Sequence, residues 1–240
     1  MKSSNNPAAL MFYARHWDLM AWLEDNWLSD NAEKMLGQAR KIGFPEDAVK
    51  KLSQLTLADG EFSRHFDEIV SEAALQARDL ARLATEEMQA ILRRAGCQCG
   101  EPKRTNARSD WGNQISVRPK DRRNDAPLWV GATVDCVLNS QGVREPRLYS
   151  WLWMKSGRGG VSTARHDSQL AHVLRSDHGM DEAIEEGWSN SIVLGSGALL
   201  EFCSESLELD AASLIATACS GRIGEITHDH VKKLYELAEG

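Results

Sequence analysis

The sequence lacks any uninterrupted apolar run of about 18 residues, the length that a membrane-spanning helix requires. Its N-terminal segment, MKSSNNPAALMFYARHWD, breaks its apolar residues with Arg15, His16 and Asp18, unlike the core of a secretory signal peptide. The 240 residues include only five cysteines, an odd number that fits reduced thiols better than a disulfide framework. We therefore expect a soluble, cytoplasmic protein without a membrane partner.

The sequence also lacks the usual phosphate-binding and catalytic motifs. It has no G-x-S-x-G nucleophile elbow. The glycine-rich stretch KSGRGG at 155–160 has neither the spacing nor the Lys-Ser/Thr of a Walker loop, and the Gly-Ser-Gly at 195–197 lies between two strand-like runs. Cys203 has no local signature to mark it as a nucleophile, although His166 or His172 could pair with it in the fold. We expect no catalytic residues, no cofactor and no enzymatic activity.

The sequence also has few of the residue patterns that bind metal ions. Cys97 and Cys99 form a lone C-x-C without a second close pair. His228 and His230 are near neighbours, but positions two apart do not face each other on a helix. We expect no metal site.

The first 95 residues have helical periodicity. The longest predicted helix covers roughly residues 60–94 and ends at Gly96. At 1.5 Å per residue it is about 50 Å long, which exceeds the needs of a small bundle and makes it a candidate homo-oligomer interface. Shorter helices precede it, the first over PAALMFYARHWDLMAWLEDNWL at 7–28 and the next ending at Gly43.

The rest of the chain changes character twice. Residues 96–125 are rich in Gly, Pro, Asn, Asp and Arg and predict a basic linker or long loop, with QISV as at most a short edge strand. Beyond it, an alternating run at 128–138 and a returning run at about 146–155 predict an antiparallel hairpin, and 191–205 predicts a second hairpin that bends at Gly-Ser-Gly. Short helices are expected over SQLAHVLRS and MDEAIEEGW, and after caps at Asp210 and Thr227.

These patterns predict an α+β fold, in which a helical N-terminal domain precedes a small antiparallel sheet flanked by helices. The predicted divisions are a helical domain at 1–95, the linker at 96–125 and an α+β domain at 126–240. The net charge of −7 is unevenly spread: residues 1–95 carry −3, residues 96–180 carry +5 and residues 181–240 carry −9. The basic middle and the acidic tail can offer faces of opposite sign to partners.

The stretch RLYSWLWMKSGRGG at 147–160 combines aromatic and basic residues. Tyr149, Trp151 and Trp153 occupy every second position and so share one face of a strand. This face could be covered by helices as part of the core, could bind a protein, or could stack nucleic-acid bases beside the basic residues. The opposite face carries Leu148, Leu152 and Met154, which match the apolar even positions of 128–138.

Together these observations favour a non-enzymatic interaction protein that regulates or inhibits another protein or a nucleoprotein complex. A phage or bacterial inhibitor of a defence complex is one form of this hypothesis. The alternative is a nucleic-acid-binding protein that uses the basic, aromatic middle segment. Trp22 joins the candidates because it diverges from Trp17 around a helix. The candidate partner-binding residues are Trp22, Arg104, Arg108, Arg118, Lys120, Arg122, Arg123, Trp151, Trp153, Lys155 and Arg158.

Overall fold

The structure is a computed structural model, and it describes most of the chain. The described residues are 8–26, 32–44, 46–47, 49–50, 62–105, 111–121, 128–138, 144–154, 191–206, 208–219 and 222–239. The chain forms two compact units: Met1–Gln76 with Cys203–Leu209, and Ala77–Phe202 with Asp210–Gly240. The three-part division expected from the sequence remains a prediction.

The first unit contains α1 (Ala8–Arg15), α2 (Trp17–Asn26), α3 (Ala32–Lys41) and the start of α5 (Phe62–Arg94). The single helix expected over 7–28 is wrong: the chain turns at His16, whose amide bonds the Tyr13 carbonyl three residues back. Arg15 donates to the carbonyl of Ser204 at 2.7 Å, which ties α1 to Cys203–Leu209. Gly43 follows α3 with a φ of +97°, as expected for a helix stop.

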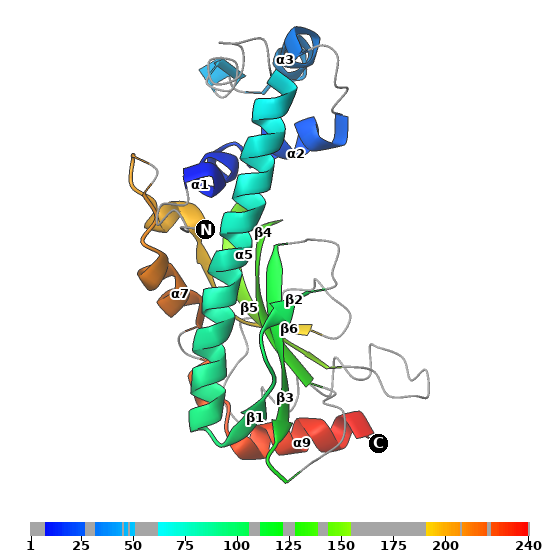
Figure 1. The fold of residues 1–240 in the computed structure, drawn as a ribbon, viewed down its shortest axis with the longest axis vertical. Coiled ribbons are helices and arrows are strands. Elements are labelled where there is room, and N and C mark those ends of the chain that lie inside the picture. The colour runs from blue at the N-terminus through cyan, green and yellow to red at the C-terminus, as the bar shows by residue number, and fades with distance from the viewer. Residues whose placement is uncertain are drawn as a thin grey trace. The chain divides into compact units, whose positions relative to one another are not determined.

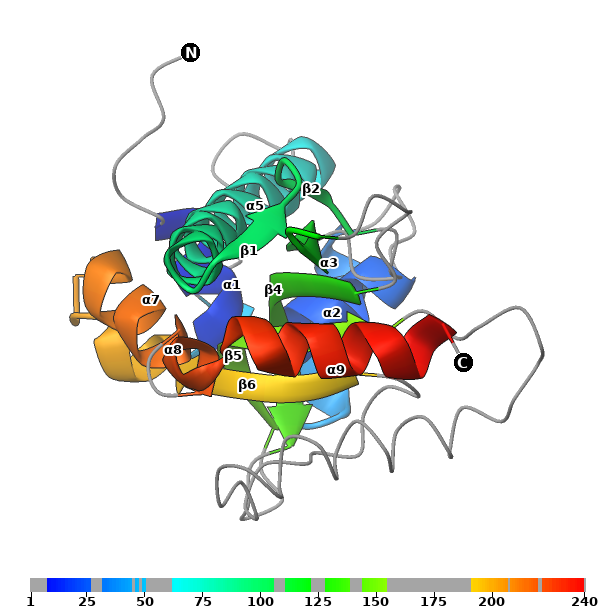
Figure 2. The ribbon, with the colours of Figure 1, turned by 90° about the horizontal axis from the view of Figure 1, so that it is seen from below.

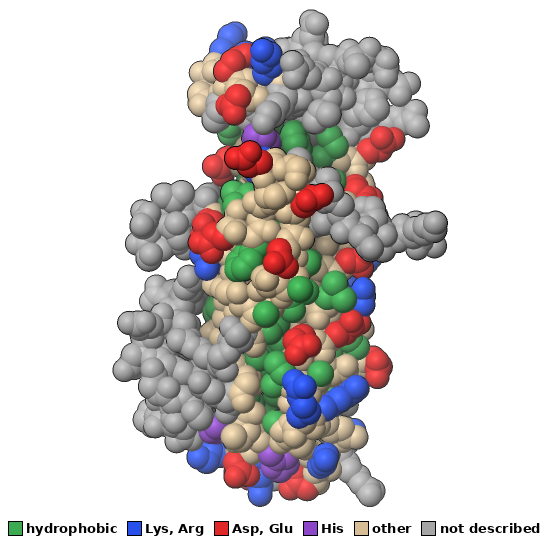
Figure 3. Space-filling view, turned by 90° about the vertical axis from the view of Figure 1, so that its left-hand side faces the viewer, with side chains coloured by type: hydrophobic (Ala, Val, Ile, Leu, Met, Phe, Trp, Pro, Cys, Tyr) green, Lys and Arg blue, Asp and Glu red, His purple; other side chains and the backbone are tan. Residues whose placement is uncertain are grey.

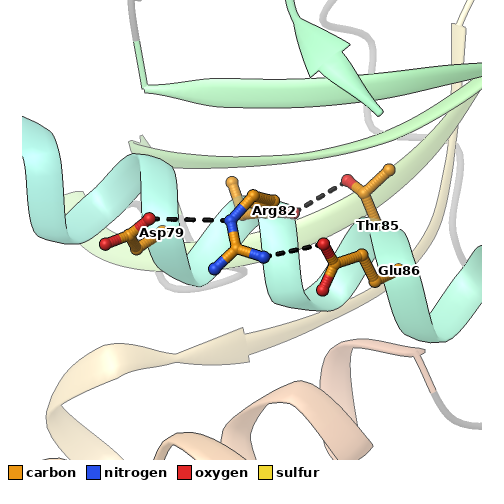
Figure 4. Close-up of polar contacts among 5 residues, drawn as sticks. Asp79, Arg82, Thr85 and Glu86 are labelled. Atoms are coloured by element: carbon orange, nitrogen blue, oxygen red, sulfur yellow. Dashed lines mark hydrogen bonds and ion pairs between the residues drawn. The ribbon is translucent and has the colours of Figure 1, made fainter. Parts of the chain in front are cut away.

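The predicted long helix is confirmed, because α5 runs unbroken for 33 residues. Figure 4 shows Arg82 on this helix between Asp79 at 3.6 Å and Glu86 at 2.7 Å. The hydrogen bond to Glu86 raises the pKa of the Arg82 guanidinium. Such solvated pairs contribute about 0.3–0.5 kcal/mol each, so burial of the opposite side of α5 is the main source of its stability. Gly96, with a φ of +88°, ends the helix.

The second unit is built on an antiparallel sheet, which confirms the α+β class (Figure 1). Its strands pair in the order β1-β3-β4-β5-β6, and β2 also pairs with β3. The hairpin expected at 128–138 and 146–155 is confirmed as β4 and β5. The strands are β1 (Cys97–Cys99), β2 (Lys103–Arg104), β3 (Gly112–Pro119), β4 (Leu128–Leu138), β5 (Arg144–Met154) and β6 (Ser191–Ala198).

Part of the expected linker is therefore sheet. Strand β3 is eight residues long and lies between β4 and the short strands β1 and β2, rather than at an edge. Ile115 and Val117 are fully buried, whereas Gln114, Ser116 and Arg118 between them are half-buried. The polar residues on one face hid a regular strand from a search for apolar runs.

The second expected hairpin is wrong, because β6 continues through Gly195 and Gly197, with one irregularity in its pairing opposite Ser150 and Trp151, and a 3₁₀ helix, η1 (Leu199–Phe202), follows it. Helix α7 (Ala211–Cys219) packs on this strand. A Cβ added at Gly195 would lie 2.6 Å from the Ala218 carbonyl, and one at Gly197 would lie 2.7 Å from Leu214. These glycines allow close helix packing instead of forming a turn.

Helices α8 (Arg222–Glu225) and α9 (His228–Glu239) complete the described chain. Both predicted caps are confirmed, since Asp210 accepts from the Ser213 amide at 3.1 Å and Thr227 from the His230 amide at 3.3 Å. Figure 2 shows α9 lying across one end of the sheet, and it contacts β3. None of the helices in the described part of the chain is long and apolar enough to cross a bilayer.

Candidate functional site

The two faces of the sheet have different surroundings. We call one the helix face, because α5 and α7 lie on this side of the strands in both ribbon views (Figures 1 and 2). Ser150 points to this side and donates to the Ala218 carbonyl of α7 at 2.6 Å. Eight aliphatic residues of this face are each at most 1% exposed: Ile115, Val117, Leu128, Val130, Ala132, Val134, Leu148 and Leu152.

The opposite face, here called the tryptophan face, is less buried. The strand register brings three tryptophans to it: Trp129 pairs with Trp153, and Trp151 pairs with Gly131. All three tryptophans are half-buried, whereas Tyr149 beside them is 8% exposed. The face includes Gln98, Lys103, Gln114, Ser116, Arg118, Trp129, Gly131, Thr133, Tyr149, Trp151 and Trp153, with Asp135 and Arg147 at one end and Val193 of β6 beside Trp151.

The indole of Trp151 is held along one edge. Its Nε1 donates to Thr133 Oγ1 at 3.0 Å. Atoms of the same edge lie over Gly131, where an added Cβ would be 2.4 Å from Trp151 Cζ2. The hydrogen bond and the missing side chain at Gly131 therefore fix the plane of this ring against β4.

Trp129 lies beneath a cation. Lys103 Nζ is 4.2 Å from the centroid of the Trp129 ring, an arrangement worth about 0.5–1 kcal/mol at an exposed site. Lys103 itself is exposed, and it comes from β2, opposite Gln114. An ammonium group and an aromatic surface therefore meet at one margin of the tryptophan face.

A second cation of the tryptophan face comes from β3. Arg118 projects from β3 and donates to Gln98 Oε1 of β1 at 2.8 Å. Lys120 and Arg104 are close in sequence to Arg118 and Lys103, and both are exposed. Arg104 pairs with Asn113, so its position in the register belongs to the helix face and not to the tryptophan face. The nearest acidic residue in sequence to β2, Glu101, lies 3.8 Å from Arg93.

The other end of the face is polar but not basic. Arg147 lies opposite Asp135 in the register and pairs with Glu145 at 2.6 Å. Near the Trp151 ring, the hydroxyls of Thr105 and Thr133 would both lie 2.7 Å from a Cβ at Gly112. Among the described side chains, Thr105 Oγ1 is one of two buried polar atoms without a hydrogen-bond partner.

The structure brings together some of the sequence-predicted site residues and separates others. Trp151, Trp153 and Arg118 share the tryptophan face, and Lys120 follows β3. Trp22 belongs to the first unit, where its ring lies 5.7 Å from that of Phe44. Five candidates lie outside the described residues: Arg108, Arg122, Arg123, Lys155 and Arg158.

Sequence reasoning missed Trp129, Gly131 and Thr133. The signal was present, because these residues are the odd positions of the strand whose even positions were recognised as apolar. In the register of β4 and β5, Thr133 pairs with Tyr149, Gly131 with Trp151 and Trp129 with Trp153. Lys103 also belongs to the basic middle segment of the sequence, but its place over Trp129 depends on the pairing of β2 with β3.

The thiols lie apart from this face. Burial raises the pKa of Cys97 and Cys99 to about 11 and that of Cys219 to about 12, so these cysteines are protonated at neutral pH. Where the structure describes the chain, no group of three or more His, Cys, Asp or Glu side chains could hold a metal ion. No protein-family model matches this chain, and neither the curated proteins nor the solved structures contain a match to it.

Proposed function

We propose that this chain is a non-enzymatic interaction protein that regulates or inhibits a nucleoprotein complex, and that it binds the complex with the tryptophan face. The observation that carries the proposal is the unequal burial of the two faces of one sheet. Three half-buried tryptophans share a face with Lys103 and Arg118, whereas eight aliphatic residues of the opposite face are each at most 1% exposed.

Tryptophan and arginine are enriched among the residues that dominate binding energies at interfaces. A ring whose plane is already fixed, as that of Trp151 is, loses little conformational freedom when a partner covers it. Binding rather than chemistry is the use that such an arrangement favours.

Site-specific photo-crosslinking in the native host tests the proposal. A photoreactive p-benzoylphenylalanine replaces Gln114, a half-buried residue of the tryptophan face, and in a matched control it replaces Ala216, an exposed residue of α7. We expect a discrete adduct of higher mass from position 114 and none from position 216. Adducts of equal yield at both positions, or at neither, would contradict the proposal.

A further inference from the structure

We infer that the ligand of the tryptophan face is a single-stranded nucleic acid, whose bases stack on Trp151 and its neighbours and whose phosphates contact Lys103 and Arg118. This inference rests on the proposed function and names the part of the nucleoprotein complex that the face contacts. DNA and RNA share the chemistry required, which is a flat base next to a phosphate.

The aromatic half of the argument is geometric. A base needs a ring of fixed orientation to stack on, and Trp151 provides one through its bond to Thr133 and its seat over Gly131. Trp129 and Trp153 are directly opposite each other on neighbouring strands, where side chains lie about 4.5–5.5 Å apart at Cβ. Three indoles on adjacent strands thus form a surface longer than one base.

The second half of the argument is charge complementarity. Lys103 lies over Trp129, and Lys103 and Arg118 both belong to the β2–β3 side of this face. At the other end, Glu145 pairs with Arg147 and Asp135 stands across from it. When the bases of a single-stranded nucleic acid lie over the tryptophans, electrostatic attraction therefore favours its phosphates on one side only, along β2 and β3.

A single strand fits this face better than a duplex. Stacking on a protein side chain requires an unpaired base, and the bases of a duplex already stack on each other. The chain as a whole carries −7, so long-range attraction to phosphates is weak and stacking must supply much of the affinity. With two phosphate contacts, the slope of log K against log salt is about −1.4.

The experiment measures fluorescence anisotropy of labelled oligo-dT and oligo-U of about 12 nucleotides, and of a duplex of the same length, with the full chain at about 50 mM salt. We expect one or both strands to bind and the duplex to bind more weakly. Trp151→Ala should weaken strand binding by about 5- to 150-fold, the range that loss of one stacked base produces.

Two pairs of charge variants provide the matched control. Lys103→Gln with Arg118→Gln should weaken binding and bring the salt slope close to zero, because both phosphate contacts are lost. Lys50→Gln with Lys232→Gln removes the same charge from exposed residues of other elements and should leave binding within about twofold. Thermal unfolding of each variant shows whether it is folded.

Three results would overturn the inference: no binding of either strand, equal binding of strand and duplex, or equal loss in the two charge variants. If strands fail to bind while position 114 still crosslinks to a protein, the inference is wrong and the proposed function stands. If no strand binds and position 114 gives no crosslink, the inference and the proposed function are both wrong.

Discussion

The helix face and the tryptophan face belong to the same strands, yet they are stabilised in different ways. On the helix face, aliphatic side chains have almost no exposure, and Gly195 and Gly197 allow α7 to pack closely on β6. On the tryptophan face, large rings are placed by a hydrogen bond, a cation and a glycine, and they keep part of their surface exposed. On the helix face close packing fills space, whereas on the tryptophan face a few specific contacts orient rings.

Figure 3 gives a useful contrast with the tryptophan face. On the side that it shows, hydrophobic side chains lie in small clusters among charged ones. Such scattered apolar residues are normal on protein surfaces and imply no partner. Leu75 and Leu83 of α5 are exposed, with exposed fractions of 47% and 43%, but two exposed leucines alone do not define an interface, so the expected homo-oligomer through this helix remains a prediction.

The largest difference between the faces should appear when neighbouring residues of β3 are truncated. Ile115→Ala on the helix face removes a fully buried side chain and should cost about 2–5 kcal/mol in the free energy of unfolding. Gln114→Ala, one residue away on the tryptophan face, should change it by about 0.5 kcal/mol or less. Urea unfolding monitored by circular dichroism measures both, and an equal cost at the two positions would mean that both faces are packed core.

Glycine substitutions should have the next largest effect. Gly195→Ala places a Cβ 2.6 Å from the Ala218 carbonyl, and Gly131→Ala places one 2.4 Å from the Asn113 carbonyl and from the Trp151 ring. Because backbone atoms block both sites, each variant should lose about 1–3 kcal/mol. Only Gly131→Ala displaces an indole, so only this variant should shift the tryptophan fluorescence of the folded protein.

Gly224→Ala is the matched control for these variants, because nothing lies within 4 Å of the added Cβ. It should leave stability unchanged or raise it by up to about 1 kcal/mol, since alanine favours a helix over glycine. A fluorescence shift in Gly195→Ala equal to that in Gly131→Ala would show that the Trp151 ring is not specially placed by Gly131.

The sequence alone predicted the elements whose signals are local. The periodicity of α5, the caps Asp210 and Thr227, and the pairing of β4 with β5 follow from neighbouring residues and were confirmed. The role of Gly195 and the strand β3 could not be found in this way. From the sequence, a glycine that allows a helix to pack closely cannot be distinguished from a glycine that forms a turn. At Gly195 the difference depends on α7, which comes later in the chain.

The candidate site was only half predictable for the same reason. Trp151 and Trp153 stand out in RLYSWLWM because of their spacing. Their partners Trp129, Thr133 and Lys103 reach them only through the register of three strand pairs, which a reading along the chain does not contain.

The smallest expected effect is the loss of one hydroxyl on each side of the sheet. Thr133→Val removes the acceptor of the Trp151 indole, and Thr85→Val removes a buried hydroxyl of α5 that donates to the Ala81 carbonyl at 2.8 Å and to the Asn113 carbonyl of β3 at 3.3 Å. Each should cost about 1 kcal/mol, because valine preserves the shape while one polar partner is lost. Only Thr133→Val should broaden or shift the Trp151 indole N–H signal in a ¹H–¹⁵N NMR spectrum, since it frees the ring edge that Thr133 holds. An unchanged indole signal in Thr133→Val, or an equal change in Thr85→Val, would show that packing alone fixes the ring, and the distinction between a packed face and an oriented one would not hold.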